Sequence, residues 1–486
     1  MNAMLKALIH HATYSGDKIA FSDEQSDISY QQLLLRVSDV ARQLVYLDPH
    51  CVALRANNGI DWVVTDLAAM WAGIPIVPVP MFFSEQQTRH LLSESGADVL
   101  IGEWQQWHPL FLGQIDSLQL WRLQQPSKQK LLRHTSKVTF TSGSTGKPKG
   151  VCLSSQQLVS ISTTLAETIA KNVRCDKHLV LLPLSTLLEN IAGVYVPILL
   201  GATSVVLSGK SVGLTGSSQF DAVQFSLALS QYLPNTMILT PALLLALIEA
   251  VQVTPKIAKN LKFVAVGGAR VSPSLLEHAH RLGIPAYEGY GLSENASVVS
   301  LNTPSKYKSG TSGKPLPHLN VKVSEDGEIL VSGNTALGYV NQPFESHWLA
   351  TGDLGYIDDE GFLVISGRKK NQIISAYGRN ISPEWLESEA QAFRELSAMV
   401  IVGEGQNTLT AIVESGDIKQ VAASLRQFNA AFPDYARIGR VIIAPPLRSV
   451  PGFYTSNGRP IRQQFEHWAR NSAQSEPCHI TTQLIE

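Results

Sequence analysis

The most informative chemistry of the chain lies in a loop rich in hydroxyl, glycine and lysine residues. Segment 137–150 reads KVTFTSGSTGKPKG, so a short apolar stretch runs directly into a loop that contains Gly143, Gly146, Lys147 and Lys149. Backbone N–H groups that are unhindered at the glycines can surround an anion, and the hydroxyls and lysines supply further donors. We therefore expect this loop to hold the phosphates of a nucleotide triphosphate.

The spacing of this loop differs from that of the Walker A phosphate-binding motif. That motif requires a glycine five residues before the glycine of its Gly-Lys pair, where this chain has Thr141. It also requires Ser or Thr after the lysine, where this chain has Pro148. The alternative is a flexible surface loop of small polar residues. The density of hydroxyl, glycine and lysine directly after an apolar strand disfavours that alternative.

The elements that must position this loop alternate between strand-like and helix-like segments over the first 270 residues. Strands are predicted at 52–56, 74–80, 98–102, 261–266 and 284–289, and helices at 60–73, at 84–96 and from Ser272 onward. Short turns with glycine or proline separate them, which is typical of βαβ units. The sequence therefore predicts an α/β fold with doubly wound, mostly parallel sheets covered by helices.

The texture changes at about residue 310. Short strands with tight turns are predicted at 326–333, 355–367 and 371–375, which indicates a small β-barrel-like part. A joint rich in Lys and Arg follows, and after it comes a compact α+β unit of about 120 residues, which is enough for a domain. We therefore predict a large N-terminal domain at 1–366 and a small mobile C-terminal domain at 367–486, joined by a hinge.

Composition excludes several classes of protein. The 486 residues carry a formal net charge of −1, and no Lys/Arg block is present, so a basic nucleic-acid binder is not expected. Hydrophobic residues make up 44%, which excludes disorder over most of the chain. The four cysteines form no CxxC pair, so neither a disulfide framework nor a structural zinc site is expected. These features favour a cytoplasmic protein.

Two apolar segments bear on targeting and membranes. The N-terminus reads MNAMLKALIHHATYSGDK, and its apolar run is too short and too broken for a signal peptide. Residues 190–209 carry no charge and are long enough to span a bilayer. This stretch changes midway from a helix-like to a strand-like pattern, so we expect a buried helix–strand unit and at most peripheral membrane contact.

Several motifs, in order along the chain, resemble those of the adenylate-forming superfamily, which includes acyl-CoA synthetases, peptide-synthetase adenylation domains and luciferases. TSGSTGKPKG at 141–150 resembles the phosphate loop of that superfamily, and YGLSE at 290–294 resembles its YGxTE segment. TGD at 351–353 matches a third motif, and GRKK at 367–370 with GRNI at 378–381 resembles its hinge segment. The resemblance covers roughly residues 12 to 465.

The resemblance implies a reaction in two halves. A carboxylate first attacks the α-phosphorus of ATP, and a thiol of coenzyme A or of a carrier-protein phosphopantetheine then attacks the acyl-adenylate. Such a displacement requires a phosphate cradle, Mg²⁺ and fixed positive charge. The implied partners are a small-molecule carboxylic acid and an acyl-carrier protein, with no nucleic acid.

The resemblance also assigns roles to individual residues. The β- and γ-phosphates are assigned to Thr141, Ser142, Gly143, Ser144, Thr145, Gly146, Lys147 and Lys149. Adenine and ribose are assigned to Gly267, Gly268, Ala269, Glu288, Gly289, Tyr290, Asp353 and Arg368. Ser293 is placed at the α-phosphate, Glu294 at Mg²⁺ and Lys370 at the hinge. The alternatives are a solvated Glu294 at a helix start and a turn-forming Asp353.

Near its C-terminus the chain departs from the family pattern. The family carries a lysine in an NGK loop that bridges the substrate carboxylate and the α-phosphate, and here the loop at 457–459 reads NGR. Arg459 keeps the charge but presents a planar fork instead of a compact ammonium. Either Arg459 performs the catalytic task with altered geometry, or adenylation is weak. A solvated loop arginine beside Arg462 is the alternative.

The segment that follows the phosphate loop in the family and lines the acyl pocket is also unusual. Thr186 stands where the family often has His, and this replacement would open the pocket. Glu189 either binds a polar group of the substrate or lies on a surface helix. The position on a surface helix is the favoured interpretation. No Asp stands where amino-acid-activating relatives hold an α-amine, so a fatty or aryl acid is favoured.

The sequence therefore predicts an ATP-dependent acid–thiol ligase. The first alternative, suggested by Arg459, is a degenerate protein that binds a nucleotide or an acyl-adenylate with little adenylation. The second, suggested by residues 190–209, is a membrane-associated acyl ligase.

Overall fold

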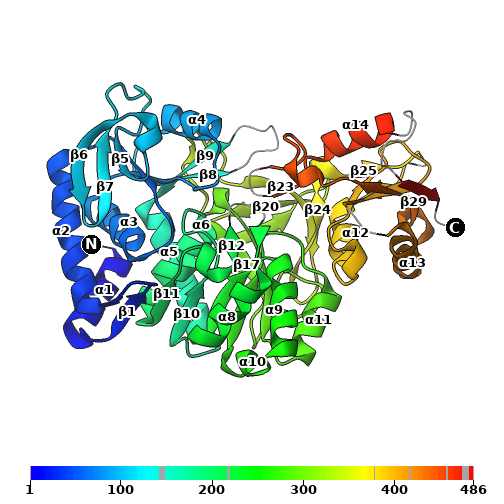
Figure 1. Cartoon of the computed structure of the whole chain (residues 1–486), viewed down its shortest axis with the longest axis horizontal. Coiled ribbons are helices and arrows are strands. Elements are labelled where there is room, and N and C mark those ends of the chain that lie inside the picture. Colours follow the sequence, from blue (N-terminus) through cyan, green and yellow to red (C-terminus); the bar gives the residue numbers. More distant parts are fainter. Residues whose placement is uncertain are drawn as a thin grey trace.

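The computed structural model describes residues 2–141, 148–215, 219–376, 378–414, 417–455, 458–472 and 481–484. Figure 1 shows a large N-terminal part, coloured blue to yellow, and a smaller orange and red C-terminal part at one end of the molecule. Residues 142–147 of the predicted phosphate loop lie outside the described residues. The predicted fold is therefore compared with the elements on either side of that loop.

One large sheet has nine strands and a parallel centre. In spatial order its strands are β18 (Lys314–Pro315), β17 (Ser297–Leu301), β16 (Ala286–Leu292), β15 (Phe263–Val266), β14 (Thr236–Leu239), β10 (Lys177–Val180), β11 (Thr203–Val206), β1 (Ile19–Ser22) and β2 (Asp27–Ser29). The strands from β16 to β1 pair in parallel, and the outer strands pair antiparallel. Three helices near this sheet lie side by side in Figure 1, namely α8 (Ala222–Tyr232), α9 (Pro241–Val253) and α11 (Pro273–Arg281), and the short α10 (Lys256–Asn260) lies below them.

A second large sheet, also of nine strands, contains the strand that enters the phosphate loop. Its order is β22 (Gln342–Pro343), β21 (Gly338–Tyr339), β9 (Lys149–Ser154), β8 (Thr135–Thr141), β4 (Ile76–Pro78), β3 (Val52–Arg55), β5 (Val99–Gly102), β7 (Leu118–Arg122) and β6 (Leu110–Ile115). Helices that contact its strands are α3 (Ile60–Ala72), α4 (Glu85–Ser95) and α5 (Ser155–Ala170), whereas α2 (Tyr30–Leu47) contacts β1 and β2 of the first sheet and α1 (Ala3–Tyr14) packs on α2. One apolar core contains residues of both large sheets, which explains why they fold as a unit.

The remaining part of the large domain is antiparallel. Its four strands are β19 (Asn320–Val323), β20 (Glu328–Ser332), β23 (Leu349–Ile357) and β24 (Leu363–Arg368). Asp358 fixes the turn between the last two, because its Oδ1 accepts the N–H groups of Glu360 and Phe362. The last of these strands, β24, ends within the predicted hinge segment at 367–370.

The C-terminal domain has its own sheet and cores. Its strands are β27 (Val400–Val402), β28 (Leu409–Glu414), β29 (Ile438–Ala444) and β30 (Thr481–Leu484), and its helices are α12 (Pro383–Ala390), α13 (Ile418–Asn429) and α14 (Arg462–Ser472). Two apolar clusters contain only residues of this domain, so the α+β prediction is confirmed.

Two further two-stranded ladders occur, one in each domain. They pair β12 (Leu214–Thr215) with β13 (Gln219–Phe220) and β25 (Ile373–Ile374) with β26 (Asn380–Ile381). Short helical turns along the chain are η1 (Gln105–Trp107), η3 (Lys210–Val212), η4 (Ser293–Asn295), η5 (Lys369–Asn371), η6 (Arg394–Leu396), η7 (Asp434–Ala436) and η8 (Leu447–Ser449).

Local sequence explains where several helices begin and end. Ser29, Ser84 and Ser154 each accept the N–H group three residues ahead, and a glutamine at that position bonds back to the serine backbone. These capping boxes satisfy donors that a helix start otherwise leaves free. At the other end of α3, Gly73 adopts φ = 71°, a left-handed conformation that favours glycine.

Residues 190–209 form the predicted helix–strand unit. The chain passes through α6 (Leu187–Asn190), the π-helical turn η2 (Ile191–Tyr195) and α7 (Val196–Leu200) and then enters β11. Among the residues that the structure describes, no helix is long and apolar enough to cross a membrane.

A buried polar cluster joins β8, α3, α6 and η2. Lys137 on β8 donates to Asp66 on α3 at 2.6 Å and to the Tyr195 hydroxyl at 2.7 Å. Asn190 donates to the second oxygen of Asp66 at 3.0 Å and also accepts from Lys137. Burial lowers the pKa of Lys137, and the charge of Asp66 opposes this effect. The cluster ties the strand that enters the phosphate loop to the helical segment at 187–195.

Candidate active site

Three predicted residues meet at the junction of the two domains. In the hairpin of β23 and β24, Asp353 lies directly opposite Arg368, so both side chains share one face. Arg368 Nε lies 2.8 Å from one oxygen of Asp353, and the Tyr290 hydroxyl donates to the other at 2.6 Å. Asp353 is only 4% exposed. We call Tyr290, Asp353 and Arg368 the ribose-side cluster.

Electrostatics in this cluster follow from its burial. Burial raises the pKa of Asp353, and the charge of Arg368 and the hydrogen bond from Tyr290 oppose that rise. For Tyr290, burial and the neighbouring carboxylate raise the pKa well above its usual value. Arg368 also donates to the Thr351 carbonyl at 3.0 Å, which fixes its fork beside the carboxylate. Asp353 is therefore held by two donors and is more than a turn-forming residue.

Glycines allow close approach of two strands beside this cluster. A Cβ on Gly267 would lie 3.2 Å from the Gly289 carbonyl oxygen, and a Cβ on Gly289 would lie 2.9 Å from Leu301 Cδ1. The next residue, Gly268, has φ = 82° and open space on its Cβ side. A flat ligand could therefore approach the backbone of 267–269 closely.

Glu288 is nearly enclosed next to these glycines. Its carboxylate accepts a hydrogen bond from Ser312 Oγ at 3.0 Å and is 7% exposed. Burial raises the pKa of Glu288 to about 7, against the opposing effects of Ser312 and Arg270. A buried carboxyl near neutrality is a common feature of ligand sites.

The predicted metal ligand lies close to the far end of the phosphate loop. Glu294 is in η4, and its carboxylate accepts a hydrogen bond from the Tyr339 hydroxyl at 3.0 Å. Lys149 Nζ lies 4.8 Å from the centre of the same tyrosine ring. Ser293 begins η4 directly after β16. Sequence reasoning missed Tyr339, because only the pairing of β21 with β9 brings it here.

A single carboxylate suits a magnesium ion that is shared with phosphate oxygens. Among the described residues, no group of three or more His, Cys, Asp or Glu side chains could hold a metal. Glu294 therefore fits Mg²⁺ that arrives with a nucleotide, and it does not fit an all-protein metal cage.

Arg459 reaches this site from the small domain. Its Nη2 donates to the Gly268 carbonyl at 2.9 Å, across 191 residues of chain. Burial lowers the pKa of Lys370, and the positive charges of Arg368 and Arg459 lower it further. Arg459 is exposed, yet its bond to the Gly268 carbonyl directs it at the large domain. Arg462, by contrast, is mostly buried and forms an ion pair with Glu387 at 2.7 Å.

The segment at 182–190 shows one error of prediction. Glu189 is fully buried, so its favoured assignment to a surface helix is wrong. One carboxylate oxygen lies 3.3 Å from His178 Nε2, and the other accepts the Leu182 N–H at 3.2 Å. Burial raises the pKa of Glu189. Thr186 precedes α6, and its hydroxyl donates to the Pro183 carbonyl at 2.7 Å.

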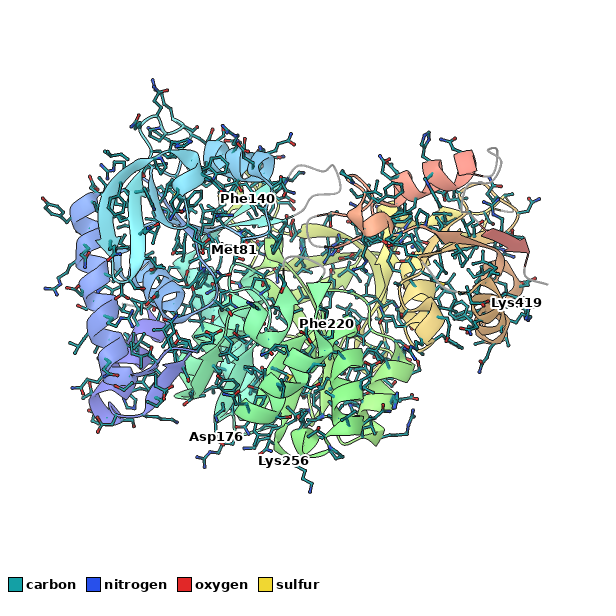
Figure 2. The ribbon with its side chains drawn as sticks, viewed as in Figure 1. Met81, Phe140, Asp176, Phe220, Lys256 and Lys419 are labelled. Carbon is teal, nitrogen blue, oxygen red and sulfur yellow. The ribbon has the colours of Figure 1, made fainter. Side chains whose placement is uncertain are left out.

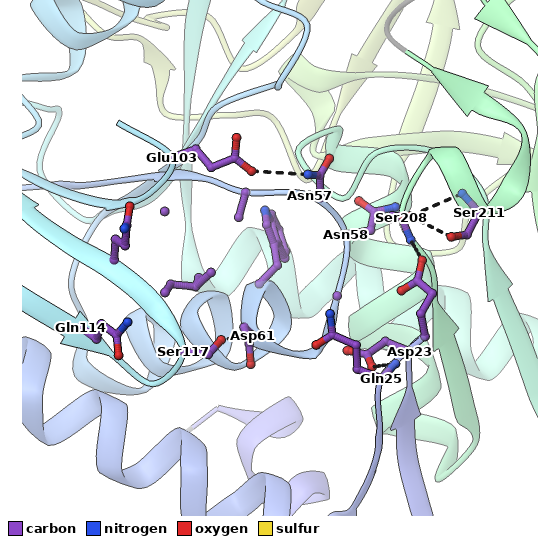
Figure 3. Close-up of a pocket in the computed structure, with 17 residues that line it drawn as sticks. Asp23, Gln25, Asn57, Asn58, Asp61, Glu103, Gln114, Ser117, Ser208 and Ser211 are labelled. Carbon is purple, nitrogen blue, oxygen red and sulfur yellow. Dashed lines mark hydrogen bonds between the residues drawn. The ribbon is translucent and has the colours of Figure 1, made fainter. Parts of the chain in front are cut away.

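A pocket of about 690 Å³ lies elsewhere, between the carboxyl ends of strands in the two large sheets (Figure 3). None of the predicted site residues that the structure describes lines it. Its acidic side chains are held by the chain itself: Asp23 accepts the Ser26 N–H at 2.9 Å, and Asp61 pairs with Arg36 at 2.5 Å. Tyr290, Asp353, Arg368 and Arg459 instead lie where β16, β23, β24 and the Arg459 loop meet.

Comparisons with known proteins agree with this geometry. The family model of the AMP-binding enzymes matches residues 8–340, which is more than half of the chain. The chain is 28% identical over 434 residues to the long-chain-fatty-acid–CoA ligase FadD15 of Mycobacterium bovis, covering 74% of this chain and 72% of that protein. It is 27% identical over 421 residues to the 2-succinylbenzoate–CoA ligase of Staphylococcus epidermidis, covering 82% and 85%.

Solved structures show the same fold. The anthranilate CoA ligase AuaEII in complex with anthranoyl-AMP superposes with a TM-score of 0.81 at 17% identity, over 98% of each chain. The o-succinylbenzoate coenzyme A synthetase MenE of Bacillus subtilis, in complex with ATP and a magnesium ion, gives a TM-score of 0.76 at 22% identity, over 94% of this chain and 98% of that one. From the family match, the fold and the site geometry together, the chain belongs to the family of AMP-binding enzymes.

Proposed function

We propose that the protein is an ATP-dependent acid–thiol ligase that activates a carboxylic acid as its acyl-adenylate and transfers the acyl group to a thiol. The observation that carries this proposal is the convergence of the ribose-side cluster with Glu294 and with Arg459 of the small domain. Membership of the AMP-binding family supports it. ATP, Mg²⁺ and coenzyme A are the cofactor and co-substrates of such a ligase.

Each residue has a role in the nucleotide complex. Asp353 accepts the ribose hydroxyls, with Arg368 beside it, and Tyr290 stacks on adenine within a pocket formed by Gly267, Gly268, Ala269, Glu288 and Gly289. The phosphates lie against Ser293 and the loop from Thr141 to Lys149. Glu294 holds Mg²⁺, which neutralises charge on the phosphate oxygens when bound.

In the first half-reaction a carboxylate oxygen of the acid forms a bond to the α-phosphorus of ATP. The bond from that phosphorus to the bridging oxygen breaks, and pyrophosphate leaves with the electron pair. Arg459 supplies positive charge to the carboxylate and the α-phosphate. Its bond to the Gly268 carbonyl at 2.9 Å supports this role, because it brings the Arg459 loop next to the proposed nucleotide site. In the second half-reaction a thiolate forms a bond to the acyl carbon, and AMP leaves.

The small domain supplies groups to both halves by rotation. The two parts that move relative to each other are 1–366 and 367–486, with Lys370 at the hinge. Lys370 lies in η5, between β24 and the small-domain sheet, which supports a pivot at that position. Rigid-body rotation about a few residues between elements is a common route to alternating sites.

A fatty or aryl acid is the proposed substrate, and coenzyme A the proposed acceptor. The relatives named above act on a long-chain fatty acid, on 2-succinylbenzoate and on anthranilate, which supports this class. Thr186 in place of a bulkier gate also favours an open acyl pocket. An acyl-carrier protein is the alternative acceptor, and we place the reaction in the cytoplasm.

The test is pyrophosphate release from ATP with a panel of C4 to C18 fatty acids and of aryl acids, with and without coenzyme A. Release that depends on one acid, and thioester formation that depends on coenzyme A, support the proposal. No release with any acid would refute it. Tight binding of a non-hydrolysable acyl-adenylate mimic without turnover would instead favour the degenerate binding protein, and flotation with liposomes tests the membrane-associated alternative.

A further inference from the structure

The glycine-rich loop at 267–272 makes an unusual set of contacts with the hinge and the small domain. It follows β15, precedes α11 and contains the residues proposed to line adenine. Its Gly268 carbonyl accepts the bond from Arg459, and Arg270 donates to the carbonyls of Ile365 and Ser366 at 2.8 and 3.3 Å. Those two carbonyls lie immediately before the hinge segment.

The third contact joins the two domains through side chains alone. Ser272 Oγ donates to Glu389 Oε2 at 3.0 Å, across 117 residues of chain. Ser272 is fully buried, and its hydroxyl is also 2.7 Å from Ser274 Oγ. A charge-assisted hydrogen bond in a protected place is among the stronger polar contacts in proteins.

Helix α12 extends this contact toward the catalytic loop of the small domain. Glu389 and Glu387 both lie on α12, and Glu387 forms a two-pronged ion pair with Arg462 at 2.7 and 3.0 Å. Arg462 begins α14, three residues after Arg459. A continuous set of contacts therefore runs from Ser272 through α12 to the segment that carries Arg459.

We propose that Ser272 and Glu389 are positioning residues, an inter-domain latch that holds the small domain in the orientation in which Arg459 reaches the site. This inference rests on the proposed function. The latch favours the first half-reaction, because it orders the adenine loop and the Arg459 segment together. Its release permits the rotation that the second half-reaction requires.

The activity test compares the two half-reactions in one variant. Glu389→Ala removes the acceptor, and we expect the ratio of ATP–pyrophosphate exchange to thioester formation from supplied acyl-adenylate to fall about tenfold. Ser272→Ala removes the donor and should give the same fall, so the result does not depend on the folding of one variant. Glu389→Gln keeps an acceptor oxygen and should restore most of the ratio.

A matched control is available inside the small domain. Ser424 Oγ donates to Glu395 at 3.2 Å, a bond of the same type that does not cross the domain junction. Glu395→Ala should leave the ratio unchanged. A ratio within twofold of the wild type in both Glu389→Ala and Ser272→Ala, with unchanged Tm, would overturn the proposal.

A distance measurement tests the latch without any substrate. Lys256 on the large domain and Lys419 on the small domain are exposed and lie far apart in Figure 2. Spin labels at Lys256→Cys and Lys419→Cys, in a background with Cys175 and Cys478 changed to serine, report the populations of domain orientations. Glu389→Ala should transfer population to a second distance. An unchanged distribution would overturn the latch, whereas a wild type that adenylates no acid would overturn only the proposed function.

Discussion

Asp353 offers the sharpest test of the ribose-side cluster. It accepts from the Tyr290 hydroxyl at 2.6 Å and from Arg368 Nε at 2.8 Å, and it is 4% exposed. Asp353→Asn keeps the volume of the side chain and removes its charge. Asp353→Ala removes both acceptor oxygens and leaves Tyr290 and Arg368 without their shared partner.

The structure sets the size of the expected effects. A hydrogen bond to a charged group contributes about 1.5–3 kcal/mol, and we take the lower end because the Arg368 side chain is 35% exposed. We therefore expect Asp353→Asn to weaken ATP binding about tenfold, which corresponds to about 1.4 kcal/mol. Asp353→Ala loses both carboxylate oxygens as hydrogen-bond acceptors, so we expect ATP binding to weaken by about 3 kcal/mol, or roughly a hundredfold.

Isothermal titration with ATP and Mg²⁺ measures these losses directly, and thermal unfolding reports whether each variant is folded. Asp176→Asn is a suitable control, because Asp176 also pairs with an arginine, Arg174, at 2.7 Å but lies at the lower edge of the large domain (Figure 2). If Asp353→Asn binds ATP within twofold of the wild type and has the same Tm, Asp353 does not contact the nucleotide and the argument fails.

Four further predictions concern other residues of the site. Arg459→Ala should lower ATP–pyrophosphate exchange by about 10²–10³-fold, while Arg459→Lys keeps the charge and most of the rate; unchanged exchange in Arg459→Ala would contradict its role. Lys370→Glu should alter thioester formation from supplied acyl-adenylate more than it alters exchange, and equal effects on both would count against a hinge. Glu288 has a pKa raised to about 7, so the folded protein binds more protons than the unfolded chain between about pH 4.5 and 7. The free energy of unfolding should therefore fall as pH rises through that window. Denaturant unfolding at several pH values measures this fall, and Glu288→Gln should flatten it. Asn295 is fully buried and neither polar atom of its amide has a partner in the described part of the chain, so Asn295→Val should raise the Tm of the ligand-free protein, and a lower Tm would show that the amide is bonded in solution.

Much of the fold follows from local rules. The predicted helix at 60–73 is observed as Ile60–Ala72, because Gly73 adopts the left-handed conformation that ends it. The predicted strand at 74–80 shrinks to Ile76–Pro78, since proline at 75, 78 and 80 removes ladder donors. Periodicity and turn residues therefore predict which elements exist, and hydrogen bonding decides their lengths.

The ribose-side cluster was accessible from sequence only through its motifs. Asp353 and Arg368 become neighbours through the register of β23 with β24, and Tyr290 joins them from a different sheet. Motif resemblance encodes such long-range contacts, whereas periodicity does not.

Other features of the site depend on partners that no local pattern identifies. Glu189 was expected at the surface, yet it is buried and its carboxylate lies 3.3 Å from Nε2 of His178, which precedes it by 11 residues in β10. Tyr339 reaches Glu294 through a strand pairing, and Ser272 reaches Glu389 only when the small domain is in place. Each of these contacts is set by tertiary packing, so each could be found only in the folded chain.

The buried cluster of Lys137, Asp66, Asn190 and Tyr195 constrains how this sequence can change over time. Loss of one partner of a buried ion pair costs about 3–5 kcal/mol, a large share of the 5–15 kcal/mol by which a typical protein is stable. Replacement of the whole set by apolar residues of similar volume is often neutral. The two solutions are therefore separated by single-substitution intermediates that fold poorly. In related sequences these four positions should covary as a set, and mutational drift should cross between the two solutions rarely.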